Sequence, residues 1–225
     1  MCKPEMRELT FLVPVLIVAN QLTFAQSNWV RKDFFMQRSH VADLAEIAIF
    51  AGLAMVLDIF TQPLAIGPWI SLSFKMTPIF LLAFRRGAKP AIMAGFIWGI
   101  LQVALGQAAG GWLNLWQGFL EYFIAFSLIG FAGLIKPWLN QSLKKNQTVK
   151  SLSLMVVGVL IGSLARYCIH FIAGILFWGS YAPKGQSALL YSSIINGSSF
   201  LGETLACIVA LLLLFPFIKK FLILD

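Results

Sequence analysis

Charged residues are scarce in this sequence, and acidic residues are scarcer than basic ones. Only 12% of the 225 residues are charged, with 9 Asp and Glu against 17 Lys and Arg, while 59% are hydrophobic. A soluble domain carries about twice this share of charged residues. The composition therefore excludes a soluble globular protein and predicts an all-α integral membrane protein.

The sequence also lacks the motifs of common enzymes and pumps. It contains no Gly-x-x-x-x-Gly-Lys-Ser/Thr phosphate loop, no His-Glu-x-x-His zinc helix and no nucleophile elbow. Its three cysteines, Cys2, Cys168 and Cys207, have neither metal-binding nor redox spacing. We therefore expect no enzymatic activity and no metal or cofactor, so energy for transport would come from a partner.

The apolar runs after residue 40 are each close to the roughly 20 residues that a bilayer requires. They predict a six-transmembrane-helix bundle over 41–217, followed by a short cytoplasmic tail over 218–225. The helices are expected at about 41–60, 69–85, 88–106, 116–135, 152–177 and 190–217. Turn-forming residues, such as Gly67-Pro68 and Lys136-Pro137, separate them.

Residues 1–40 differ from this pattern. Their apolar run at 9–25 is interrupted by Pro14, Asn20 and Gln21, and a polar, basic stretch follows it. We interpret this segment as an N-terminal extension that is peripheral or disordered. A signal peptide and an upstream start codon are the alternatives.

Basic residues gather in alternate connections between the predicted helices. They comprise Arg31, Lys32 and Arg38; Arg85, Arg86 and Lys89; Lys136, Lys144, Lys145 and Lys150; and Lys219 and Lys220. Positive loops mark the cytoplasmic side of a membrane protein. The pattern predicts that both ends of the bundle are cytoplasmic, in a multi-pass protein of the bacterial plasma membrane.

Glu121 is the most informative residue, because a carboxylate within a membrane helix is costly and usually functional. Trp112, Trp116 and Tyr122 lie close to it in sequence. A carboxylate among aromatic faces suits a cation that carries a flat ring. An ion pair with a neighbouring helix, with the Trp residues in an interfacial belt, is the alternative interpretation.

Other polar residues are expected at a similar depth near the outer side. Trp69, His170, Trp178, Tyr191 and Asn196 come from three predicted helices and their ends, and Glu121 adds a fourth. Singly, each is explained by a belt or by packing, but together they favour a ligand pocket that opens to the outside.

Three ionisable residues, Lys75, Arg166 and Glu203, are expected deeper in the bundle. Arg166 and Glu203 have similar predicted depths, so we expect an ion pair between them. Asp58 is expected at the interface. Ala48 and Gly52 form a small-xxx-small spacing, which predicts either an internal packing seam or a partner surface.

The segment from Leu44 to Phe217 resembles the thiamine-specific S-component of energy-coupling factor (ECF) transporters. The matching stretches include Phe84-Arg85-Arg86-Gly87, Gly95-Phe96-Ile97-Trp98-Gly99, Phe119-Leu120-Glu121-Tyr122, His170-Phe171-Ile172-Ala173-Gly174, Phe177-Trp178, and Tyr191 with Asn196-Gly197. The order of so many matches is specific, although no single match would be.

The resemblance implies a high-affinity thiamine-binding subunit with an outward-facing pocket. It implies partners as well: a transmembrane coupling subunit and two cytoplasmic ATPase subunits, which alone use ATP. Glu121 would face the thiazolium cation and Trp178 would stack on a ring of thiamine. The other implied pocket residues are Tyr122, His170, Tyr191, Asn196, Trp69 and Gly174, and Ala48 and Gly52 would contact the coupling subunit.

The sequence departs from this family at some positions. Ser73 stands where some members carry an acid, and Arg166 stands where a Lys is found. An S-component for a different vitamin or for another small cationic aromatic ligand is therefore an alternative. A membrane enzyme that uses Glu121 and His170, and a channel, are more distant alternatives. Nothing in the sequence indicates nucleic-acid binding.

Overall fold

Helices account for the regular structure in the part of the chain that the structure describes. The computed structural model describes residues 41–61 and 73–223, and no strand occurs within these two ranges. The expected extension at 1–40, the site candidate Trp69 and the last two residues of the tail lie outside them. The chain from Ala45 onward forms one compact unit.

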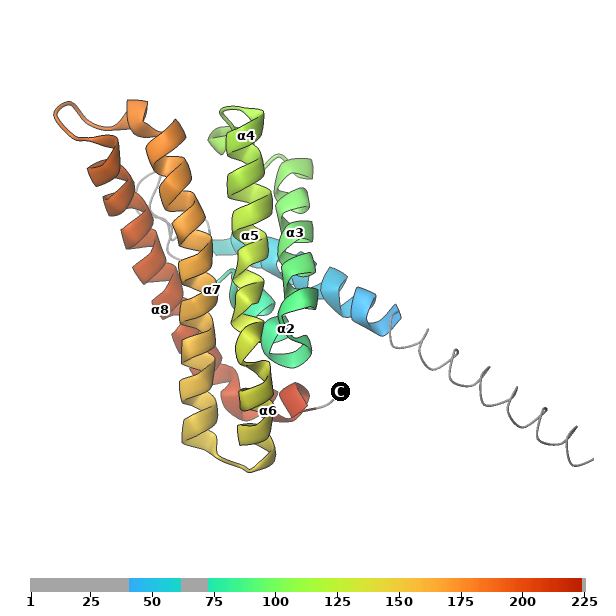
Figure 1. The fold of residues 1–225 in the computed structure, drawn as a ribbon. Coiled ribbons are helices and arrows are strands. Elements are labelled where there is room, and N and C mark those ends of the chain that lie inside the picture. The colour runs from blue at the N-terminus through green and yellow to red at the C-terminus, as the bar shows by residue number, and fades with distance from the viewer. Residues whose placement is uncertain (1–40, 62–72, 224–225) are drawn as a thin grey trace, which may run out of the picture. The chain divides into compact units, whose positions relative to one another are not determined.

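Four helices are long and apolar enough to cross a membrane, judged by length and composition. They are Val41–Thr61, Leu115–Lys144, α7 (Thr148–Phe177) and α8 (Ala188–Ile223). Two shorter helices, α2 (Thr77–Arg86) and α3 (Ala88–Ala104), lie between the first and second of these in sequence. Figure 1 shows α3, α7 and α8 running along the segment that carries α4, α5 and α6.

The Leu115–Lys144 span is one continuous helix with changes of winding. It comprises α4 (Leu115–Gly118), a π-helical turn η3 (Phe119–Ile124), α5 (Ala125–Leu128), a 3₁₀ segment η4 (Ile129–Ile135) and α6 (Lys136–Lys144). Two short 3₁₀ turns, η2 (Ala109–Gly111) and η5 (Gly179–Tyr181), lie in the connections at the α4 end of the molecule.

Three expected boundaries were wrong. Lys136-Pro137 does not end a helix, because Pro137 occupies the first turn of α6, where no backbone N–H is needed. Helix α2 starts at Thr77, with Pro78 in its first turn, and Ser73–Met76 before it is not helical. Helix α8 continues through Pro216 to Ile223 instead of ending near 217.

Close helix packing positions the cavity described below. Helix α3 packs against η3, α5 and η4, and α7 packs against α8 and η4. Gly95 and Gly99 of α3 make this approach possible, because a Cβ on either would collide with the carbonyl oxygens of Phe126 and Tyr122. Trp98, on the same helix, is completely buried.

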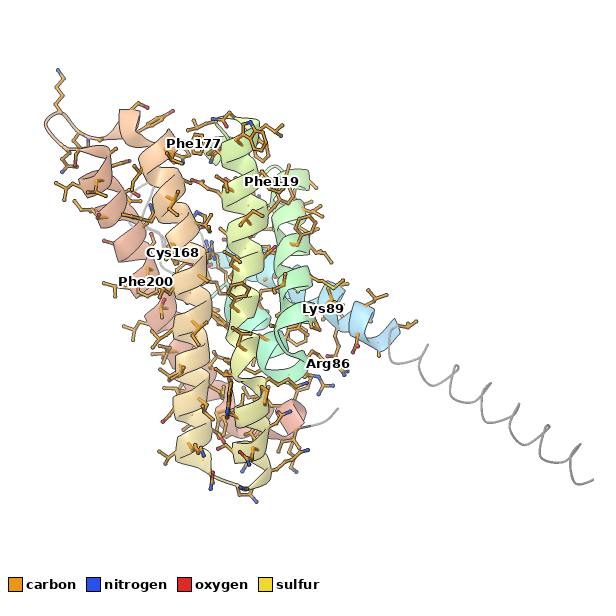
Figure 2. All side chains as sticks on the ribbon, viewed as in Figure 1. Arg86, Lys89, Phe119, Cys168, Phe177 and Phe200 are labelled. Atoms are coloured by element: carbon orange, nitrogen blue, oxygen red, sulfur yellow. The ribbon has the colours of Figure 1, made fainter. Side chains whose placement is uncertain are left out.

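Basic and aromatic residues mark opposite ends of the helices. Figure 2 places Phe119 and Phe177 toward one end, and Arg86 and Lys89 toward the other. At the basic end, Arg85 and Arg86 both donate hydrogen bonds to the carboxylate of Glu46, at 2.8–3.0 Å. Arg85 also donates to the carbonyl oxygen of Phe221 near the end of α8. Guanidinium groups of these two residues thus join three helices at one end.

Candidate ligand-binding site

A cavity of about 460 Å³ lies at the aromatic end of the helices. This volume is within the range of small-molecule sites. Its wall is formed by Gln107, Gly110, Gly111, Glu121, Tyr122, His170, Gly174, Trp178, Tyr191, Ser192, Ile195 and Asn196. Each ligand-binding residue that the family resemblance implied and that the structure describes is in this set, while Trp69 lies outside the described residues.

Glu121 and Tyr122 lie within the π-helical turn η3. A π turn holds one residue more than an α turn, and such turns are frequent at functional sites. Asn114 caps the start of this span by accepting a hydrogen bond of 3.0 Å from the backbone N–H of Gln117. The start of the helix and its wider turn therefore fix where Glu121 enters the cavity wall.

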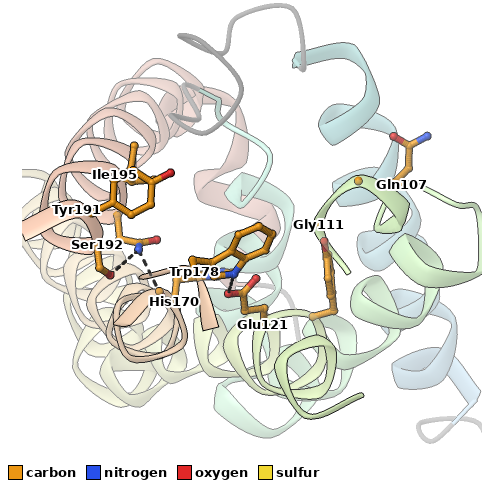
Figure 3. Close-up of a pocket in the computed structure, with 12 residues that line it drawn as sticks. Gln107, Gly111, Glu121, His170, Trp178, Tyr191, Ser192 and Ile195 are labelled. Carbon is orange, nitrogen blue, oxygen red and sulfur yellow. Dashed lines mark hydrogen bonds between the residues drawn. The ribbon is translucent and has the colours of Figure 1, made fainter. Parts of the chain in front are cut away.

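Two neutral donors hold the carboxylate of Glu121. The indole Nε1 of Trp178 donates to Oε1 at 2.8 Å, and the side-chain amide of Gln117 donates to Oε2 at 2.8 Å. Figure 3 shows the bond between Trp178 and Glu121 at the cavity. An ionised carboxylate accepts at about four lone-pair positions, so acceptor capacity remains for a ligand.

Gln117 is a functional residue that the sequence analysis did not single out. It is wholly buried, its amide also donates to the carbonyl oxygen of Gly111 at 2.8 Å, and its Oε1 accepts from the N–H of Leu113 at 3.0 Å. Gln117 thereby ties the loop beside the cavity to Glu121. The available signal was its position four residues before Glu121, where helical side chains meet.

Tyr122 forms a second aromatic wall. Its ring stacks on Trp112 with centroids 5.9 Å apart and an interplanar angle of 15°, and its hydroxyl donates to the carbonyl oxygen of Ala108 at 3.4 Å. Trp116 was expected to join these aromatics around Glu121, but it is 73% exposed and is not part of the cavity wall. Successive side chains on a helix point in different directions, so Gln117 is buried while its neighbour Trp116 is exposed.

The α8 side of the cavity depends on Gly174 of α7. A Cβ at Gly174 would collide with the hydroxyl of Ser192, and it would lie 2.9 Å from the amide nitrogen of Asn196. That amide donates to Ser192 at 3.1 Å and to the carbonyl oxygen of His170 at 3.3 Å. The absence of a side chain at Gly174 allows these polar groups to reach the wall. Ser192, Ile195, Gln107, Gly110 and Gly111 were not proposed from the sequence.

His170 also lines the cavity, and its ring contacts a buried basic residue. The Nε of Arg166 donates to Nε2 of His170 at 3.3 Å. The Arg166 guanidinium lies over the ring of Phe126, 4.5 Å from its centroid. Arg166 itself is 4% exposed and is not among the residues of the cavity wall.

The expected ion pair between Arg166 and Glu203 is confirmed, with Nη1 and Oε2 3.6 Å apart. It belongs to a larger network, because Lys75 Nζ lies 3.1 Å from Glu203 and 3.1 Å from Asp58. Asp58 also accepts a hydrogen bond from Gln102. The expected interfacial position of Asp58 was therefore wrong, since the residue is buried and paired.

Ala48 and Gly52 lie one turn apart on Val41–Thr61. Ala48 is exposed, and a Cβ at Gly52 would meet no atom within 4 Å. Within the described residues, this small-xxx-small pair therefore packs against nothing closely. Of the two expectations, a partner surface fits this exposure better than an internal packing seam.

Comparison with known proteins gives consistent matches. The family model described as thiamine transporter protein (Thia_YuaJ) matches residues 44–223. The thiamine transporter ThiT of Lacticaseibacillus paracasei is 42% identical over 174 residues, which cover 77% of this chain and 86% of that protein. ThiT of Bacillus subtilis is 34% identical over 180 residues, covering 80% and 93% of the two chains.

A solved structure agrees with these sequence matches. ThiT from Listeria monocytogenes superposes with a TM-score of 0.77 at 37% identity, over 82% of this chain and 98% of that one. These relatives are named as transporters and not as enzymes, and the long apolar helices are those of a multi-pass protein of the cell membrane. With a family model matching residues 44–223 and a shared fold, the chain belongs to the thiamine transporter family.

Proposed function

We propose that this chain is the thiamine-binding S-component of an ECF-type vitamin transporter. It captures thiamine in the cavity around Glu121 and passes it on through a coupling subunit and two cytoplasmic ATPases. The observation that carries the proposal is the Glu121 carboxylate, held by Trp178 and Gln117 on the wall of a cavity with aromatic sides.

Thiamine matches the chemistry of this wall. It is a permanent cation with two flat heterocycles, so it needs a carboxylate to offset its charge and aromatic faces on which to lie. Glu121 supplies the charge, and Tyr122, Trp178 and Tyr191 supply rings. His170 and Asn196 add hydrogen-bonding groups. An uncharged vitamin would leave the carboxylate without a cation, which is costly inside a membrane.

The distribution of charge supports a cavity that opens outward. One basic connection, Arg85 to Lys89, joins α2 to α3. The other, Lys144 to Lys150, joins α6 to α7. Trp178 follows the opposite end of α7, and Tyr191 lies in the first turn of α8. Since basic loops mark the cytoplasm, the cavity end would face outward.

The partners would include a coupling subunit that contacts Val41–Thr61. Exposed Ala48 and the open surface at Gly52 let another helix approach this backbone closely. The sequence has no phosphate-binding loop of its own, so ATP hydrolysis would take place on other chains.

The test is a titration of the detergent-purified protein with thiamine, followed by intrinsic tryptophan fluorescence. Trp178 and Trp112 lie at or beside the cavity and would report occupancy. We expect saturable quenching by thiamine and none by riboflavin or biotin. Quenching by another vitamin and not by thiamine would show that the protein binds that vitamin instead. No response from folded protein would overturn ligand binding at this cavity.

A further inference from the structure

A buried layer of charged residues lies next to the cavity, because Arg166 contacts His170 of the cavity wall. Among the described residues it contains two carboxylates, Asp58 and Glu203, and two cations, Lys75 and Arg166. Glu203 has no exposed surface. Removing a charge from water costs several kcal/mol in a protein interior, so each charge here needs compensation.

Glu203 is the centre of this layer. Its Oε2 accepts from the Tyr167 hydroxyl at 2.7 Å, and its Oε1 accepts from the Ser73 hydroxyl at 3.2 Å. Lys75 and Arg166 approach the same carboxylate, at 3.1 and 3.6 Å. Two hydroxyls and two cations, which come from two parts of the chain, thus surround one carboxylate.

Arg166 connects this layer to the cavity. Its guanidinium carbon lies over the aromatic rings of Phe126, Trp98 and Tyr167, at 4.5, 5.4 and 5.5 Å from their centroids. Its Nε donates to Nε2 of His170, which lines the cavity. Arg166 is therefore held behind the wall, and of these two residues only His170 lines the cavity.

The direction of that hydrogen bond defines the protonation of His170. An arginine N–H is always a donor, so Nε2 of His170 must be the acceptor and carries no proton. The neutral ring then has its proton on Nδ1. A neutral imidazole beside a cationic ligand avoids the repulsion that an imidazolium would cause.

We propose that Glu203 and Arg166 are positioning residues for cation selectivity in this cavity. Glu203 anchors Arg166 behind the wall, which keeps that cation away from Glu121 and holds His170 neutral with its proton on Nδ1. Within the described residues, Glu121 accepts hydrogen bonds from the neutral donors Trp178 and Gln117, so its charge is left for the ligand. This inference rests on thiamine binding as proposed above.

Loss of the Glu203 charge would leave an excess cation next to the cavity. In Glu203→Gln, Lys75 keeps its ion pair with Asp58, whereas Arg166 loses its ion pair with Glu203. The layer then has two cations and one carboxylate, and the excess positive charge lies beside the cavity. A charge at this range in a low dielectric opposes a cationic ligand more than a neutral one of the same shape. If Glu203 had only a structural role, its replacement would weaken the binding of both ligands equally.

The experiment compares thiamine with its neutral isostere, in which a thiophene replaces the thiazolium ring. Calorimetric titrations of wild type, Glu203→Gln and Glu203→Leu/Arg166→Met give the ratio of the two affinities. We expect Glu203→Gln to weaken thiamine about tenfold or more and the isostere less than about threefold. The double variant, which removes both charges, regains the wild-type preference for thiamine.

Thr204→Val is the matched control, since Thr204 is the next residue of α8, is buried, and its hydroxyl makes no hydrogen bond among the described residues. It should leave the ratio unchanged. Equal losses for both ligands in Glu203→Gln, or an unchanged ratio, would overturn the inference while leaving thiamine binding intact. A wild-type protein that binds neither ligand would instead overturn the proposed function.

A second measurement reports directly on the His170 ring. The chain has 2 histidines, His40 and His170, so ¹⁵N-histidine labelling with His40→Gln isolates the His170 ring. The spectrum should show a protonated Nδ1 and an unprotonated Nε2, and a mixture of tautomers in Arg166→Met. A protonated Nε2 in the otherwise wild-type protein would refute the positioning of His170.

Discussion

The indole Nε1 of Trp178 and the Oε1 of Glu121 are joined by a hydrogen bond of 2.8 Å. This bond connects the residue after α7 to the π-helical turn η3, which are distant in sequence. It orients the carboxylate and leaves the indole ring on the cavity wall. One residue thus serves both as donor to the acid and as an aromatic surface for the ligand.

Glu121→Gln should weaken thiamine binding by at least about tenfold, or about 1.4 kcal/mol. The amide keeps the size of the side chain but has no charge to offset the thiazolium. Fluorescence titration of the purified variant measures the effect, and an unaltered melting temperature shows that the fold is intact. An unchanged dissociation constant would remove the carboxylate from the binding mechanism.

Trp178→Phe should weaken thiamine binding by about tenfold, because it retains an aromatic ring but loses the hydrogen bond to Glu121. A hydrogen bond to a charged group contributes about 1.5–3 kcal/mol. Trp178→Leu removes the ring as well and should weaken binding further. Calorimetry on both variants separates the two roles, and wild-type affinity in the Phe variant would show that the hydrogen bond is dispensable.

Gln117→Leu should destabilise the protein by about 1–3 kcal/mol, because the Gly111 carbonyl and the Leu113 N–H lose their buried partner. Glu121 also loses one donor, so ligand affinity falls too. Thermal unfolding with and without thiamine measures both effects. Trp116→Phe, at the exposed neighbouring position, is the control and should unfold like the wild type.

Gly174→Ala should reduce affinity with little loss of fold, since the new methyl group displaces Ser192 and Asn196 from the cavity wall. Overpacking of this kind costs about 1–3 kcal/mol. Gly197→Ala is a matched helical control, because a Cβ at Gly197 meets no atom within 4 Å. Equal affinities for the two variants would show that the α8 wall does not contact the ligand.

Glu203→Leu should destabilise the protein more than Glu203→Leu/Arg166→Met. Breaking a buried pair by removing one partner costs about 3–5 kcal/mol, whereas apolar replacement of both charges costs less. Lys75 retains Asp58 in either variant. Melting temperatures in detergent test this order, and equal losses would show that Arg166 and Glu203 do not stabilise each other.

Hydropathy and turn residues were sufficient to predict the all-α class, whereas the full set of pocket residues, Gly174 among them, was predicted from the family resemblance. Glu121, His170 and Asn196 could be assigned similar depths because helical rise is regular. Contacts between residues that are distant in the sequence could not be predicted in this way. Asp58, Lys75 and Gln102 come from three separate elements, and no local pattern pairs them.

The changes of winding within the Leu115–Lys144 helix could not be predicted from the sequence either. Proline commonly marks a break in a helix, but Pro137 lies in the first turn of α6, immediately after the 3₁₀ segment η4. The π turn at Phe119–Ile124 changes the helical phase by one residue without changing hydropathy. Trp116 was wrongly placed with Glu121, whereas Gln117 keeps the ordinary spacing of four residues from Glu121.

The placement of the acids has an electrical consequence for the whole molecule. Four of the 9 acidic residues, Glu46, Asp58, Glu121 and Glu203, bond to groups inside the protein. Their bonds described above go to other groups than the exposed lysines Lys144, Lys145, Lys150 and Lys220. Near an anionic membrane surface each such lysine contributes about 1 kcal/mol of attraction. This attraction weakens as the salt concentration rises, because dissolved ions screen exposed charges.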